Sequence, residues 1–290
     1  MQDVIQALIG KLDGDMTLEQ RHYLRFLYDH LHLEELNNRE QQYFINYFFE
    51  SESLQNMAAF ALELAESIQE MQENIPAIEQ AERLANSHEQ RLYYERKCSE
   101  QRRQQLKQQT TKQDNVLYVP FQHTKKECGP MIICLEQTAG MAAYSELCKS
   151  MILPLFMHAH QEGRDLYIVP YNHQIHVHYR FENGHVNIAD FQSFINYKAS
   201  GEAAMLPVLQ FVHALLQENQ QDAEADVIVF TEGTPIDGQQ LMSEQATAML
   251  EDMTQKYHAE FSVVAMQEEH FNPQQFWFAH KAFFADHAIQ

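Results

Sequence analysis

Three glutamates lie beside apolar runs in positions where their carboxylates could meet. Glu136 directly follows the run Met131 to Leu135, and Glu232 lies at the end of the segment VIVFTEG. Glu202, in the segment SGEAAM, comes just before a stretch with helical periodicity. Carboxylates that meet can hold a hard cation such as Mg²⁺, and without a cation they raise one another's pKa.

Short apolar runs alternate with helical stretches from Val116 onward, which predicts an α/β fold with an open, doubly wound, mainly parallel sheet. The expected strands are Met131 to Leu135, Leu166 to Val169, Ile175 to Tyr179, Val227 to Thr231 and Phe261 to Ala265. The expected helices are Ala142 to Glu162, Ala203 to Gln217, Gly238 to Tyr257 and, behind an Asn272 cap, Pro273 to His287. Ligands of such sheets bind outside the carboxyl ends of the strands. We therefore expect Glu136 and Glu232 on adjacent loops at one edge.

Residues 1–113 carry a different pattern, which predicts an all-helical N-terminal region. Thr17 with Gln20 forms a capping box, Asn37 with Glu40 opens a second helix, and a third covers about residues 53–72. A polar fourth helix, about residues 77–109, ends in the chain's basic block. We interpret this block as a solvated helix leading into an exposed linker, or as a docking surface for an acidic partner or for the acidic domain of this same protein. The second expected domain is residues 114–290.

Composition limits the possible partners and locations of the protein. The 290 residues carry a formal net charge of −21, so most of the surface would repel a nucleic-acid backbone. No stretch approaches the ~20 apolar residues that a membrane span needs. The four cysteines form no CxxC pair, and the opening residues do not resemble a signal peptide. These features predict a cytoplasmic protein without a membrane span.

The order of the segments LEQTAGM, SGE and FTEG resembles the von Willebrand factor type A (VWA) domain over about residues 129–270. In that family, an Asp-x-Ser-x-Ser loop, a Thr and a second Asp form the metal-ion-dependent adhesion site. The resemblance places Glu136 at the first Asp, Thr138 and Gly140 at the two Ser, Glu202 at the Thr, and Glu232 at the second Asp.

The resemblance implies a metal site that has become degenerate. Glu is one methylene longer than Asp, Gly140 offers no hydroxyl, and Mg²⁺ tolerates poor geometry badly. The acids could separate into solvent and hold no metal, rebuild a weaker site for Mg²⁺ or another divalent cation, or accept a basic side chain of a partner. We expect no bound cofactor.

The resemblance also implies a function. Bacterial VWA proteins pair with MoxR-type AAA+ ATPases, so we expect an interaction module or adaptor with such a partner. The alternative is a metal-dependent hydrolase or cation-dependent ligand-binding protein that uses Glu136, Glu202 and Glu232. The chain contains no GxxxxGK[ST], GxGxxG, GxSxG or HExxH motif, and we expect no enzyme activity.

Three histidines in the segment NHQIHVHYR, at positions 173, 176 and 178, form a second candidate site. Alternate residues of a strand share a face, so His176 and His178 could chelate a transition metal. A third ligand is not evident from the sequence. We favour the interpretation that they form the polar outer face of an edge strand.

Overall fold

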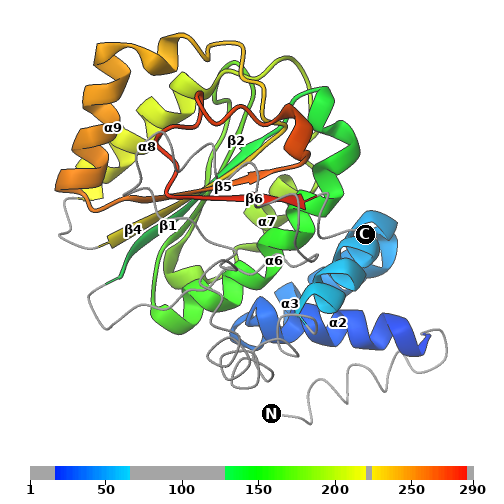
Figure 1. The fold of residues 1–290 in the computed structure, drawn as a ribbon. Coiled ribbons are helices and arrows are strands. Elements are labelled where there is room, and N and C mark those ends of the chain that lie inside the picture. Colours follow the sequence, from blue (N-terminus) through cyan, green and yellow to red (C-terminus); the bar gives the residue numbers. More distant parts are fainter. Residues whose placement is uncertain (1–16, 66–127, 220–223, 286–290) are drawn as a thin grey trace, which may run out of the picture.

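The computed structural model describes residues 17–65, 128–219 and 224–285. At its centre is a six-stranded sheet with the order β3-β2-β1-β4-β5-β6 (Figure 1). The strands are β1 (Cys128–Glu136), β2 (Leu166–Tyr171), β3 (Tyr179–Phe181), β4 (Glu224–Thr231), β5 (Glu260–Ala265) and β6 (Lys281–Phe284). All neighbouring pairs of this sheet are parallel except β2 with β3. The chain builds outward from β1 through β2 and later from β4 through β5, so the strand order reverses between β1 and β4.

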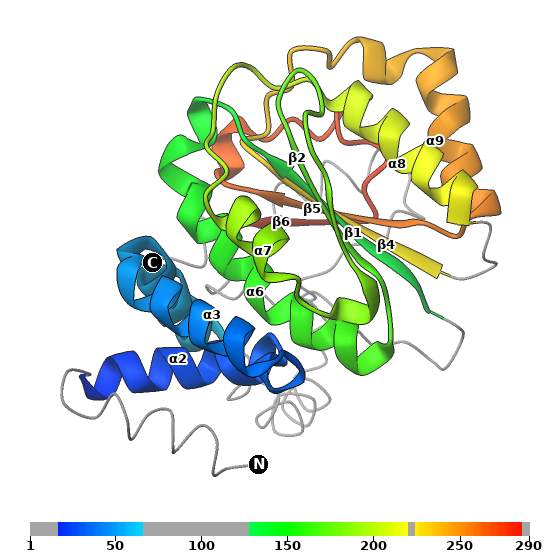
Figure 2. The ribbon, with the colours of Figure 1, turned by 180° about the vertical axis from the view of Figure 1, so that it is seen from behind.

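Helices cover both faces of this sheet. One face carries α6 (Ser145–Glu162) and α7 (Ile188–Ile195), and the other carries α8 (Met205–Asn219) and α9 (Glu244–Lys256) (Figures 1 and 2). The one-turn helices are η1 (Leu33–Glu35), η3 (Gly140–Tyr144), η4 (Glu182–Gly184), η5 (Gln240–Met242) and η6 (Glu268–His270). Successive β1 residues point to opposite faces, so Ile133 joins the α6 core and Ile132 joins the α8 core. Burial on both faces explains why the strands are continuous apolar runs.

The N-terminal helices pack on the outer side of α6. They are α2 (Leu18–His30), α3 (Asn38–Glu50) and a helix whose described part covers residues 52–65 (Figure 2). Reciprocal capping boxes begin both α2 and α3, at Thr17 and Asn37. Phe44 of α3 lies 5.8 Å from Phe191 of α7 between ring centroids, within one apolar cluster that continues to the sheet. The helices therefore share a core with the α/β part.

The structure confirms the predicted fold class and the helices that begin at Thr17 and Asn37. The basic fourth helix and the linker lie outside the described residues, so the division at residue 113 stays a prediction. Among the described residues, no helix is both long and apolar enough to cross a membrane.

Three details of the sequence prediction were wrong. The expected helix Pro273 to His287 is instead a series of turns followed by β6, which extends the sheet beside β5. The predicted strand Ile175 to Tyr179 begins only at Tyr179, and α7 was missed. In the first case Phe276 and Phe278 are buried against the α9 side of the sheet, and this packing overrides helical periodicity.

Candidate functional site

The carboxyl ends of β1 and β4 meet at the point where the strand order reverses, which is where doubly wound sheets bind ligands. Glu136 is the last residue of β1, and Glu232 directly follows β4. The Glu232 backbone N–H donates to Glu136 Oε2 at 3.2 Å. This contact confirms that the two acidic positions lie on adjacent loops.

The Glu136 side chain is buried, and both of its oxygens accept hydrogen bonds from the protein. The Thr138 hydroxyl donates to Oε1 at 2.8 Å, and the Thr231 hydroxyl donates to Oε2 at 2.6 Å. Burial raises the pKa of Glu136, the hydrogen bonds from Thr231, Thr138 and the Glu232 backbone oppose the shift, and the charge of Glu232 adds to it. Hydrogen-bond donors of the protein therefore occupy the positions around the Glu136 carboxylate that a cation would otherwise take.

Gly140 is packed against the side chain of Glu232. A β-carbon built on Gly140 would enter the space of the Glu232 carboxylate, which shows how closely the two residues approach. A serine, which the VWA loop has at the position of Gly140, could fit only if the Glu232 side chain moved. The carboxylate of Glu232 thus occupies the space that a serine side chain at position 140 would need.

Glu202 takes no part in this arrangement, because its side chain is exposed. Its loop nevertheless contacts the other two loops through backbone hydrogen bonds. Ala139 N–H donates to Gly201 O at 3.1 Å, and Ile236 N–H donates to Ala203 O at 2.9 Å. We call the three loops, residues 137–140, 198–204 and 232–237, the loop edge.

Sequence reasoning missed the residues that hold the loop edge together. Thr231 connects β4 to Glu136 and accepts the Gly233 N–H at 3.0 Å. Asn172 donates to Ser200 O at 3.0 Å. Asp237 accepts the backbone N–H groups of Met205 and Leu206 at 2.8 and 2.7 Å and so caps α8. Only Thr231 had a local signal, since it directly precedes Glu232 at the end of an apolar run.

The donor chemistry of the loop edge does not fit a Mg²⁺ ion in this arrangement. Thr138 donates its hydroxyl proton to Glu136, Gly140 has no side-chain ligand atom, and Glu202 is exposed to solvent. Within the described part of the chain, these acids form no group of three ligand atoms within 4.8 Å of one another. The alternative of a hydrolase built on Glu136, Glu202 and Glu232 gains no geometric support.

The three histidines before β3 also do not form a metal-binding group among the described residues. All three are exposed, and the His178 ring lies 5.0 Å from Phe211. The ring centroids of His173 and His176 are 6.4 Å apart. The interpretation of an edge-strand face was wrong, because none of the three histidines lies in a strand and β3 begins only at Tyr179. They form an exposed segment that leads into this edge strand.

Comparison with known proteins gives no family assignment. No protein-family model matches the chain, and no curated protein sequence matches it. Among solved structures, the chain is similar to the SpRpn10 VWA domain (TM-score 0.40, 11% identity), with 56% of this chain and 83% of that chain covered. It is also similar to a von Willebrand factor type A protein from Catenulispora acidiphila (TM-score 0.36, 11% identity; 51% and 35% covered). A third similar structure is the pilus adhesin SpaC from Lactobacillus rhamnosus GG (TM-score 0.41, 10% identity; 56% and 28% covered).

Proposed function

We propose that the protein is a cytoplasmic protein-interaction module whose loop edge docks a protein partner by shape and charge, with a degenerate metal site. The observation that carries this proposal is the internal pairing of Glu136, whose carboxylate oxygens both accept hydrogen bonds from the chain. An acid used in this way fixes the shape of the loops and needs neither a cation nor a substrate.

The exposed groups of the loop edge suit a partner with basic and apolar side chains. Ile236 is 62% exposed in a loop that backbone hydrogen bonds hold in place, so its side chain is available for an apolar contact with a partner. Glu202 is exposed beside it, and Glu232 is half-buried. A basic side chain could pair with these acids, and the net charge of −21 would steer such a partner toward the protein.

From the resemblance, we propose a MoxR-type AAA+ ATPase as the partner, with the N-terminal helices in an adaptor role. The experiment is co-purification of the tagged full chain from its native host, followed by mass spectrometry. The parent chain and a Glu202→Lys/Ile236→Asp variant are compared. We expect the ATPase to be captured by the parent chain and lost from the variant, because the variant reverses a charge and removes the apolar contact.

A matched control is Glu251→Lys, which reverses an exposed charge on α9, away from the loop edge. It should capture the ATPase as the parent does. Equal capture by all three chains would contradict the docking surface. Capture of other proteins without the ATPase would contradict the proposed partner.

A further inference from the structure

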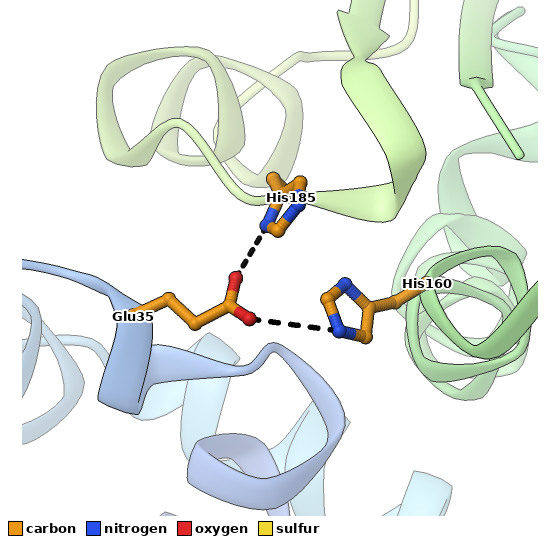
Figure 3. A group of neighbouring side chains, drawn as sticks. All are labelled: Glu35, His160 and His185. Carbon is orange, nitrogen blue, oxygen red and sulfur yellow. Dashed lines mark ion pairs between the residues drawn. The ribbon is translucent and has the colours of Figure 1, made fainter. Parts of the chain in front are cut away.

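Three side chains far apart in the sequence converge where the N-terminal helices meet the α/β part (Figure 3). Glu35 comes from η1, His160 from the last turn of α6, and His185 follows η4. Glu35 Oε1 lies 3.6 Å from His160 Nε2, and Glu35 Oε2 pairs with His185 Nδ1. One ligand atom from each residue lies within 4.8 Å of the other two, and no other such group of three occurs among the residues that the structure describes.

The backbone is shaped to bring these residues together. Gly184 has a φ of 72°, and a β-carbon there would lie 2.5 Å from His160 N and 2.9 Å from His160 Cα. Only glycine lets η4 approach α6 this closely, and this approach places His185 beside His160. On the other side, His32 adopts a left-handed conformation with φ of 49° at the start of η1, which is uncommon for a residue with a side chain.

The His32 ring also supports the group. It stacks on the His160 ring, with 3.6 Å between centroids and an interplanar angle of 30°. Stacking limits the rotation of the His160 ring, so this imidazole is held in place before any ligand binds. The group is therefore partly preorganised.

Two imidazoles and one carboxylate form a donor set that suits zinc. Three protein ligands of this kind leave a fourth position open for water, and His₂Glu is among the zinc sets that proteins use. In tetrahedral zinc with bonds of roughly 2.0–2.1 Å, ligand atoms are about 3.4 Å apart, so small side-chain rotations would complete the geometry. Glu35 and His185 have side chains that are 42% and 48% exposed, so an ion can reach them from solvent.

We propose that Glu35, His160 and His185 bind one zinc ion, which fastens η1 of the N-terminal region to α6 and η4. This site lies apart from the loop edge and is independent of the proposed docking function. Because the ligands come from three separate elements, the bound ion would hold the N-terminal helices against the α/β part. An ion that binds only this assembled form must stabilise it.

The test is titration of the metal-free full chain with Zn²⁺, followed by calorimetry and by the melting temperature. We expect one zinc per chain at this site and a higher melting temperature. Glu35→Gln and His185→Gln should each lower the affinity at least about tenfold, the loss typical even for outer partners of metal ligands. Both residues are exposed, so the variants should fold, as circular dichroism can verify.

Two controls separate this site from general binding by a chain with 16 histidines. Glu50→Gln removes the same charge from an exposed position at the end of α3 without removing a ligand, and His173→Gln/His176→Gln removes two other exposed imidazoles. Both should bind zinc as the parent chain does. Mg²⁺, which prefers oxygen ligands, should not replace zinc.

Hydrogen exchange gives a second measurement. Zinc should slow exchange in peptides that cover η1 and η4 of the parent chain, but not in Glu35→Gln. If Glu35→Gln and His185→Gln bind zinc as tightly as the parent chain, the site is wrong. Absence of zinc binding by the parent chain would equally overturn it, and the three residues would then be a pair of histidine–carboxylate contacts.

Discussion

Gly184 offers a sharp test of how η4 is positioned, because a second glycine provides a matched comparison. Gly184 and Gly163 both have left-handed backbones, with φ of 72° and 64°. A β-carbon on Gly184 would clash with the backbone of His160, whereas a β-carbon on Gly163 meets nothing within 4 Å. Replacing each with alanine therefore separates the cost of the left-handed conformation from the cost of the clash.

The expected magnitudes follow from these two costs. A left-handed alanine costs roughly 1–2 kcal/mol, and this is the whole expected effect of Gly163→Ala. Gly184→Ala bears the same cost and also forces η4 away from α6, where overpacking typically costs about 1–3 kcal/mol more. The contact is with backbone atoms, so no side-chain rotation can relieve it. We expect Gly184→Ala to lower the free energy of unfolding by roughly 2–5 kcal/mol.

Urea denaturation of the parent chain and both variants measures these differences. Circular dichroism and the fluorescence of the single tryptophan, Trp277, should give coincident transitions if unfolding is two-state. The slope with denaturant should stay constant while the midpoint moves. Equal destabilisation by the two substitutions would refute the close approach of η4 to α6. The Gly184→Ala chain should also bind zinc more weakly than the Gly163→Ala chain, because His185 moves away from His160.

Three further predictions concern ionisation and domain structure. Burial raises the pKa of Glu136 above 4.5, so the folded chain holds this proton more tightly than the unfolded chain. As pH rises above 4.5, the free energy of unfolding of the parent chain should therefore fall relative to that of Glu136→Gln. Millimolar Mg²⁺ should leave the melting temperature of both chains unchanged, and a stabilisation by Mg²⁺ that Glu136→Gln abolishes would contradict this. Burial lowers the pKa of Lys149 from 10.5 to about 8, while its ammonium donates to Ile195 O and Tyr197 O at 2.7 and 2.8 Å. Between these pH values Lys149 is protonated in the unfolded chain but neutral in the folded chain, so the free energy of unfolding of the parent chain should rise by roughly 3 kcal/mol relative to Lys149→Met as pH rises. Denaturation at several pH values measures this difference, and a difference that does not change with pH would contradict it. Limited proteolysis should cut between about Gln104 and Asn115, and the two fragments should stay associated through the apolar core that they share; resistance to cleavage would contradict the exposed linker, and separation of the fragments would contradict the shared core.

Local sequence determined the elements whose signals lie within a few residues. The capping boxes at Thr17 and Asn37 are complete in four residues each, and both begin helices in the structure. The apolar runs of β1 and β4 are buried on both faces, and their continuity made them recognisable as strands. Because parallel strands end at the same edge, the positions of Glu136 and Glu232 followed from the same pattern.

The tertiary structure decided what depends on distant neighbours. The aromatic run near the C-terminus has helical spacing, but pairing with β5 and burial against the sheet make its end a strand. The hydrogen bond between Thr231 and Glu136 could not be read from the sequence, because the two residues are 95 positions apart. The group of Glu35, His160 and His185 has no sequence signal at all. It exists because a glycine in η4 fits against the backbone of α6 and η1 packs beside both, and contacts of this kind are fixed only when the chain has folded.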